Sequence, residues 1–179
     1  MTLTLLIGGA RSGKSSLAVD IGRRHHAAGL AVSYVATAPC LDEDMQTRIV
    51  RHRAERPDSW QTIEEEVDLA AALDAAGDGL VIVDCLTLWT SNMMWREMTD
   101  DDITGRAVDV AAQAAARPDP TVVITNEVGL GVHPETDVGR RYRDILGRVN
   151  QAWAAAADPA LLLVAGRAVC LVDPWDHLR

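Results

Sequence analysis

Phenylalanine is absent from this chain of 179 residues, and alanine is abundant. We attribute this bias to genomic composition and helical packing, and it carries no functional content. No apolar stretch reaches the roughly 20 residues that span a bilayer. The apolar segment 3–7 lacks a basic region before it and a cleavage site after it, so we expect a core strand there rather than a signal peptide.

Positive charge is also in short supply. The chain has 17 Lys and Arg against 26 Asp and Glu, which gives a formal net charge of −9. Binding to nucleic acid or to an anionic membrane depends on an excess of Lys and Arg, so the composition argues against both. We expect the partners to be small molecules or other proteins.

Cysteine is scarce as well. The three cysteines, Cys40, Cys85 and Cys170, are not spaced like metal ligands, and an odd number cannot close a disulfide framework. This usage favours a protein of the reducing cytoplasm.

The most specific motif begins directly after the first apolar segment. It matches the P-loop pattern, Gly, any four residues, then Gly-Lys-Ser/Thr, in Gly8, Gly9, Ala10, Arg11, Ser12, Gly13, Lys14 and Ser15. A helix-compatible segment, 16–28, follows, so backbone N–H groups at a helix N-terminus can surround a phosphate. The motif predicts a bound nucleoside triphosphate, with Lys14 at the β- and γ-phosphates and the Ser15 hydroxyl on Mg²⁺.

Strand-like and helical segments alternate along the chain. We expect strands at 3–7, 30–36, 61–64, 80–84, 121–125, 161–165 and 168–172. We expect helices at 16–28, 42–56, 67–76, 86–98, 103–116 and 138–157. This order predicts one α/β domain over residues 1–179, with a largely parallel sheet covered by helices on both faces. Ligands of such sheets bind at the carboxyl ends of the strands.

Polar residues end two of the expected strands. Asp84 completes a Walker-B pattern, whose carboxylate holds Mg²⁺ directly or through water, although an acid there can also simply cap the next helix. Asn126 and Glu127 are suited to holding an attacking hydroxyl or a water, and the alternative is a loop stapled by its own Asn side chain. The residues leave both choices open.

The expected helix 42–56 is unusually basic for an acidic chain. His52 has four arginines near it: Arg48, Arg51, Arg53 and Arg56. Such a cluster suits recognition of a triphosphate. A histidine among arginines tends to stay neutral, which suits a nucleophile or base. The alternative is a half-buried helix histidine without chemistry.

Several motifs together resemble one family. Besides the P-loop they are Tyr34 to Ala38; Asp42 to Met45 with Arg48, Ile49, His52, Arg56 and Pro57; Asn126 to Gly131 with Pro134 and Glu135; and Arg143 to Gln151. Over nearly its whole length the chain resembles the bifunctional adenosylcobinamide kinase/adenosylcobinamide-phosphate guanylyltransferases of cobalamin biosynthesis. The resemblance implies a RecA-like P-loop fold. It also implies that ATP or GTP phosphorylates the aminopropanol hydroxyl of adenosylcobinamide, after which a histidine takes GMP from GTP and passes it to the cobinamide phosphate.

The resemblance also implies roles for single residues. His52 corresponds to the guanylylated histidine, and the P-loop with Lys14 serves both reactions. Around the GTP the resemblance places Thr37, Ala38, Pro39, Arg53, Ala54, Glu55, Arg56, Glu64 and Asp84. Some relatives have Glu where this chain has Asp84, and the shorter side chain suits Mg²⁺ held through water. Family members are reported as trimers, so the resemblance also implies a homo-oligomer.

Two other functions remain open at this point. A different P-loop small-molecule kinase needs Lys14 and Asp84 but no reactive histidine. A regulatory nucleotide switch would be read by a partner protein, although the sequence has no guanine-reading Asn-Lys-x-Asp motif. The residues identify neither the preferred phosphate donor nor the contacts with the corrinoid.

Overall fold

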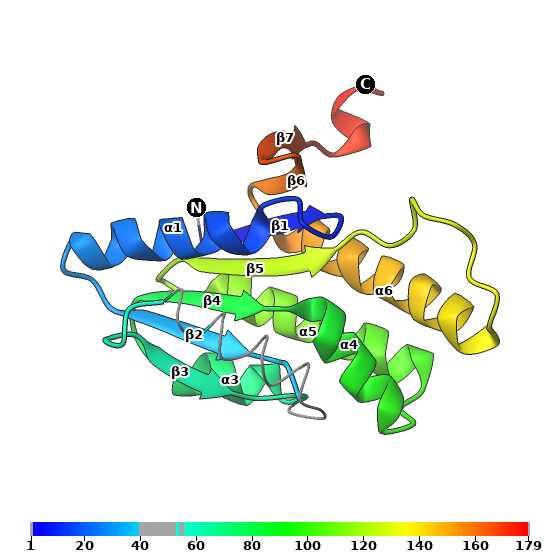
Figure 1. Cartoon of the computed structure of the whole chain (residues 1–179), viewed down its shortest axis with the longest axis horizontal. Helices are drawn as coiled ribbons and strands as arrows, with labels where there is room; N and C mark the ends of the chain where they lie inside the picture. The colour runs from blue at the N-terminus through cyan, green and yellow to red at the C-terminus, as the bar shows by residue number, and fades with distance from the viewer. Residues whose placement is uncertain (1, 40–52, 54–55, 179) are drawn as a thin grey trace.

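The computed structural model describes residues 2–39, 53 and 56–178 (Figure 1). Seven strands in these ranges form one sheet in the order β3-β2-β4-β5-β1-β6-β7. They are β1 (Leu3–Gly8), β2 (Val32–Ala36), β3 (Gln61–Glu64), β4 (Leu80–Asp84), β5 (Thr121–Asn126), β6 (Ala160–Val164) and β7 (Arg167–Leu171). Neighbouring strands are parallel except for the antiparallel β6–β7 pair. The largely parallel sheet predicted from the sequence is confirmed.

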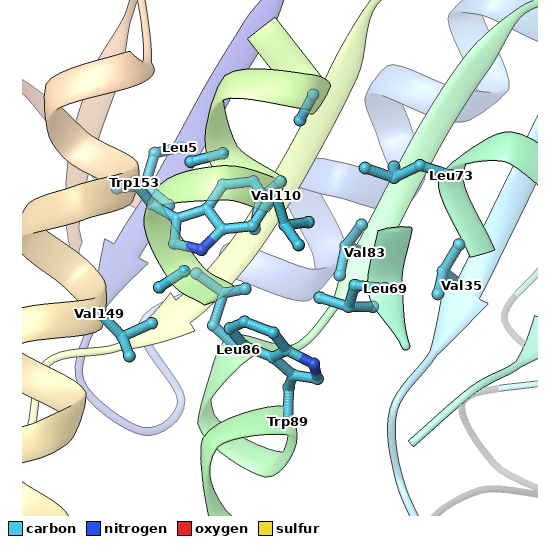
Figure 2. Close-up of a cluster of buried hydrophobic side chains, with 14 of the residues drawn as sticks. Leu5, Val35, Leu69, Leu73, Val83, Leu86, Trp89, Val110, Val149 and Trp153 are labelled. Carbon is cyan, nitrogen blue, oxygen red and sulfur yellow. The ribbon is translucent and has the colours of Figure 1, made fainter. Parts of the chain in front are cut away.

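Helices cover both faces of this sheet. They are α1 (Lys14–Ala27), α3 (Leu69–Ala75), α4 (Leu86–Trp95), α5 (Asp100–Ala116) and α6 (Asp137–Ala156), and a short 3₁₀ helix, η1 (Pro174–Asp176), follows β7. One face packs against α3, α4, α5 and α6 around Trp89 and Trp153 (Figure 2). The other face packs against α1 through Ala18 and Val19. No helix in the described parts of the chain has both the length and the hydropathy to cross a membrane.

Alternation along the strands explains the two cores. Successive side chains of a strand point to opposite faces, so residues two apart share a face. Val81 and Val83 of β4 accordingly lie in the core beneath α3 to α6, whereas Leu80 and Ile82 lie in the core beneath α1. Residues 80–83 of β4 are therefore all apolar, and the strand ends in Asp84.

Two helix boundaries lie three residues from the expected ones, and the other described helix ends differ by two residues or fewer. Helix α5 begins at Asp100 rather than 103, because the Thr99 side chain caps it by accepting a hydrogen bond from Asp102 N and acidic residues fill the first turn. Helix α4 ends at Trp95 rather than 98, and Glu97 takes a φ of 57°. In both cases local backbone geometry decides where the helix begins or ends, and the pattern of apolar residues does not record it. The helix expected at 42–56 lies outside the described residues except for Arg53 and Arg56.

The sheet brings separate strand ends to one edge. Gly8 at the end of β1 is in register with Asn126 at the end of β5. Ala36 at the end of β2 is in register with Asp84 at the end of β4. The P-loop and the Walker-B acid therefore leave the sheet on the same side (Figure 1).

Gly22 of α1 packs directly against Trp60. A Cβ atom at Gly22 would overlap the indole, within 2.8 Å of Cζ2. Gly22→Ala should therefore lower the free energy of unfolding by about 1–3 kcal/mol through overpacking. Gly105→Ala in α5 is the matched control, because no residue that the structure describes lies within 4 Å of a Cβ placed there; it should raise stability by roughly 0.5–1 kcal/mol. Urea denaturation measures both changes, and a stabilised Gly22→Ala would contradict this packing.

Candidate nucleotide-binding site

The P-loop joins β1 to α1 and closes on its own lysine. The Lys14 ammonium donates hydrogen bonds to the carbonyl oxygens of Gly8 (2.9 Å) and Gly9 (2.7 Å) and to the Ser12 hydroxyl (3.3 Å). Lys14 is 6% exposed. Burial lowers the pKa of Lys14, and the neighbouring Cys85 and Asp84 oppose that shift. The loop therefore presents a poorly hydrated cation next to the Asp84 carboxylate.

Glycine is required at both ends of this loop. Gly13 is the N-cap of α1 with a φ of 99°, a conformation that side chains rarely adopt. Gly8 lies against the carbonyl oxygen of Leu163 in β6, and a Cβ there would overlap it. The turn between β6 and β7 supports the loop from outside, because Gly166 N donates a hydrogen bond to Ser12 O (2.9 Å). The sequence motif gave no sign of this last contact, which joins residues more than 150 positions apart.

Thr37 ties the end of β2 to the end of β4. Its hydroxyl accepts a hydrogen bond from Cys85 N and donates one to Cys85 O, both at 2.7 Å. Its N–H donates to Asp84 O (3.0 Å), and its carbonyl accepts from Asn92 Nδ2 (2.8 Å). Every polar group of Thr37 is thus bound within the protein, and the side chain is fully buried. Thr37 fixes the point where Ala38 and Pro39 leave the sheet, and its contact with GTP stays a prediction.

Asp84 is held by Tyr34 of the neighbouring strand. The Tyr34 hydroxyl donates a hydrogen bond to Asp84 Oδ2 at 2.5 Å. The same tyrosine ring stacks against Arg56, whose Cζ lies 3.8 Å from the ring centroid. Burial raises the pKa of Tyr34 well above its usual value, and the negative charge of Asp84 adds to that shift. The hydroxyl therefore stays protonated and acts as a donor to the carboxylate.

Asn126 and Glu127 are fixed next to the P-loop. Glu127 N donates to Gly8 O (3.1 Å), and Asn126 N donates to Thr87 Oγ1 (3.0 Å). The side chain that staples the following loop is Glu127, which accepts from Gly129 N at 2.5 Å. The choice between a binding role and a loop staple for the Asn126 side chain stays a prediction.

Asn150 of α6 holds the end of β5 through two side-chain hydrogen bonds. Its side chain accepts a hydrogen bond from Thr125 Oγ1 (2.7 Å) and donates one to Asn126 O (3.0 Å). Sequence reasoning gave Asn150 no role, although it lies in one of the motifs that carry the family resemblance. Its amide supplies both a donor and an acceptor, and this explains why an Asn fits there.

The structure brings most of the predicted site residues to one edge. The P-loop with Lys14 and Ser15, the segment Thr37 to Pro39, Arg56 and Asp84 all lie at the carboxyl ends of β1, β2 and β4 or contact residues there. Glu64 ends β3, is exposed and is in register with Ala36, one strand farther out. Arg53 is exposed. His52, Ala54 and Glu55 lie outside the described residues.

A P-loop after β1 and an acid at the end of β4, on a mostly parallel sheet, define a RecA-like P-loop nucleotide-binding protein. The same fold occurs in a KaiC-like protein from Pyrococcus horikoshii, with a TM-score of 0.52, 14% identity, and coverage of 90% of this chain and 70% of that one. The chain belongs to the cobinamide kinase/cobinamide phosphate guanyltransferase family, whose model matches residues 4–171. The predicted fold class and family resemblance are confirmed.

Two curated relatives agree with that family. The bifunctional adenosylcobalamin biosynthesis protein CobP of Pseudomonas aeruginosa is 41% identical, over 90% of this chain and 92% of that protein. The bifunctional adenosylcobalamin biosynthesis protein CobU of Salmonella typhimurium is 38% identical, over 92% of this chain and 96% of that protein. The similarity therefore extends over nearly the full length of all three chains.

Two adjacent glycines test the geometry of the loop. Gly8→Ala should lower the free energy of unfolding by about 1–3 kcal/mol, because the backbone must shift away from Leu163 O. It should also weaken nucleotide binding, since the same shift moves the carbonyl that holds Lys14. Among the described residues, nothing lies within 4 Å of a Cβ at Gly9, so Gly9→Ala should change stability by less than about 0.5 kcal/mol. Thermal denaturation compares the two, and equal losses would contradict the contact with β6.

Proposed function

We propose that this chain catalyses both reactions that the name of its family describes. It phosphorylates the aminopropanol hydroxyl of adenosylcobinamide with ATP or GTP, and then transfers GMP from GTP to give adenosylcobinamide-GDP. The observation that carries the proposal is the family match over residues 4–171, which includes the P-loop, Asp84 and His52. The alternatives of another small-molecule kinase or a regulatory switch have no comparable support.

In the kinase reaction the protein supplies position and charge. Phosphoryl transfer spreads negative charge over the phosphate oxygens, and fixed donors stabilise it. Lys14 already donates to three oxygen atoms of its own loop, and phosphate oxygens can replace these acceptors when the nucleotide binds. Because Lys14 is buried, its charge is weakly screened and acts strongly on the phosphates.

The residues at this edge suit a Mg²⁺ ion that accompanies the nucleotide. Ser15 lies in the first turn of α1 beside Lys14, and Asp84 is close enough to Lys14 to affect its pKa. Both offer the oxygen ligands that Mg²⁺ prefers. A bound Mg²⁺ would neutralise part of the phosphate charge, while Ser15 and Asp84 hold it in place.

In the second reaction we propose His52 as the nucleophile. An imidazole nitrogen forms a P–N bond to the α-phosphorus of GTP, and the bond to the departing pyrophosphate breaks. A phosphate oxygen of adenosylcobinamide phosphate then attacks the same phosphorus, and the P–N bond breaks to restore the imidazole. Splitting one transfer into two in-line displacements lowers each barrier. The assignment of His52 comes from the resemblance to the family.

Covalent labelling tests this assignment. GTP labelled in its α-phosphate should attach GMP to the protein through a bond that acid breaks and base spares. His52→Ala should abolish both the label and the formation of adenosylcobinamide-GDP. Kinase activity should partly survive, because phosphoryl transfer to a bound hydroxyl needs positioning and charge rather than a protein nucleophile.

Two further variants complete this experiment, one as a control for the label and one as a test of the P-loop. His26→Ala should keep the label, because His26 lies in the last turn of α1, at the opposite end from the P-loop. Lys14→Ala should slow both reactions by about 100-fold or more, as expected for loss of a cation at the phosphates. A label that persists in His52→Ala, or that resists acid, would leave a plain P-loop kinase as the better description.

We also propose that the chain forms a homotrimer, as the family resemblance implies, and acts in the cytoplasm. Strand β7 is the last strand of the sheet, and large apolar side chains at the end of β6, in β7 and after it are exposed: Val164, Val169, Leu171, Val172, Trp175 and Leu178. An exposed apolar sheet edge favours association with another chain. Light scattering should therefore give three times the 19.3 kDa mass of one chain, and a monomeric mass would contradict the proposal.

A further inference from the structure

Tyr34 connects two groups that the sequence places far apart. It lies in β2 in register with Ile82 of β4. Residues two apart in a strand share a face, so Asp84 projects from the same face of the sheet as Tyr34. This register sets the 2.5 Å hydrogen bond from the Tyr34 hydroxyl to Asp84 Oδ2. Tyr34 is 4% exposed, which leaves its hydroxyl little access to water.

The hydroxyl orients the carboxylate. A hydrogen bond to an ionised acceptor is short and stronger than one between neutral groups. With Oδ2 held by Tyr34, rotation of the carboxyl group is restricted, and the direction of Oδ1 is set as well. A metal ligand that is oriented in advance loses less rotational freedom when the ion binds.

The ring of Tyr34 has a separate contact. The guanidinium of Arg56 stacks on it at 3.8 Å, a favourable cation–π geometry. Arg56 follows His52 by four residues in the sequence. The segment that follows Arg56 is also held in place. Trp60 N donates a hydrogen bond to Pro57 O (3.1 Å), and the Trp60 indole packs on Gly22 of α1. The Tyr34 ring thus fixes an arginine on the segment that continues from His52.

We propose that Tyr34 is a positioning residue for both reactions. Its hydroxyl orients Asp84 for the Mg²⁺–nucleotide complex, and its ring fixes Arg56 for guanylylation. The first half rests on the proposed metal role of Asp84, and the second on the proposed role of His52. Different atoms of one side chain carry the two roles, so substitutions can separate them.

Tyr34→Phe tests the hydroxyl, because it removes one oxygen and keeps the ring. The readout is equilibrium binding of a fluorescent GTP analogue with a non-cleavable α,β-bridge, with and without Mg²⁺. Affinity without Mg²⁺ should stay within about twofold, and the gain in affinity that Mg²⁺ produces should fall about fivefold or more, as for loss of one charge-assisted hydrogen bond. A purely structural role would lower both affinities by the same factor.

The chain offers a matched control, because it has just two tyrosines. Tyr142 of α6 donates a hydrogen bond to a backbone carbonyl, Thr87 O (3.2 Å), so Tyr142→Phe should keep the full effect of Mg²⁺. Asp84→Asn should lose that effect. If Asp84→Asn keeps it, the proposed metal role of Asp84 is wrong. If Asp84→Asn loses it and Tyr34→Phe keeps it, the role of the Tyr34 hydroxyl alone is overturned.

Tyr34→Leu and Arg56→Lys test the ring. Both remove the stacked pair, so at saturating Mg²⁺ covalent GMP labelling should be at least about threefold slower than in Tyr34→Phe. Thermal unfolding shows whether each variant is folded, and Arg56→Lys decides the matter if Tyr34→Leu is not. Equal labelling rates in Tyr34→Phe and Arg56→Lys would overturn the role of the ring. Absence of any label in the unsubstituted protein would instead contradict the proposed function.

Discussion

A buried ammonium group needs hydrogen-bond acceptors, and the nucleotide site of this protein depends on how Lys14 obtains them. The acceptors are two carbonyl groups and a hydroxyl of the loop that carries the lysine itself. This arrangement closes the P-loop around its own cation and avoids the cost of an unpaired buried charge. The closed loop in turn requires the backbone of Gly8 and Gly13, and it is supported by the β6–β7 turn.

The second constraint is the register of the parallel strands. It aligns the end of β4 with the end of β2 and the end of β1 with that of β5. Thr37 then ties β2 to β4 through Cys85, while Asn150 ties α6 to β5. The polar groups of Thr37 and Asn150 are thus bound within the protein, and these hydrogen bonds fix the strand ends at one edge of the sheet. Binding groups on such a rigid frame lose little entropy when a nucleotide arrives.

Much of the fold followed from local patterns. Apolar runs identified the central strands β1, β2, β4 and β5, since strands buried on both faces are largely apolar. The edge strands β3 and β7 are more exposed and carry a weaker pattern. Helix ends were harder to predict, because Thr99 caps α5 from outside the apolar pattern and Glu97, just after α4, takes a positive φ. The loop after β5 was left open by the sequence, because no local pattern identifies Glu127 as the residue that accepts the hydrogen bond from Gly129 N.

The sequence by itself determined the P-loop, because its eight residues are contiguous and their chemistry is local. It also determined the family, since the motifs extend over nearly the whole chain. Only the tertiary structure decided that Tyr34, Arg56 and Asp84 form one cluster and that Gly166 supports Ser12. Those residues come from segments separated by about 20 to 150 positions, and no local pattern encodes their distance. Pairing between strands sets it, and that pairing exists only once the whole sheet has formed.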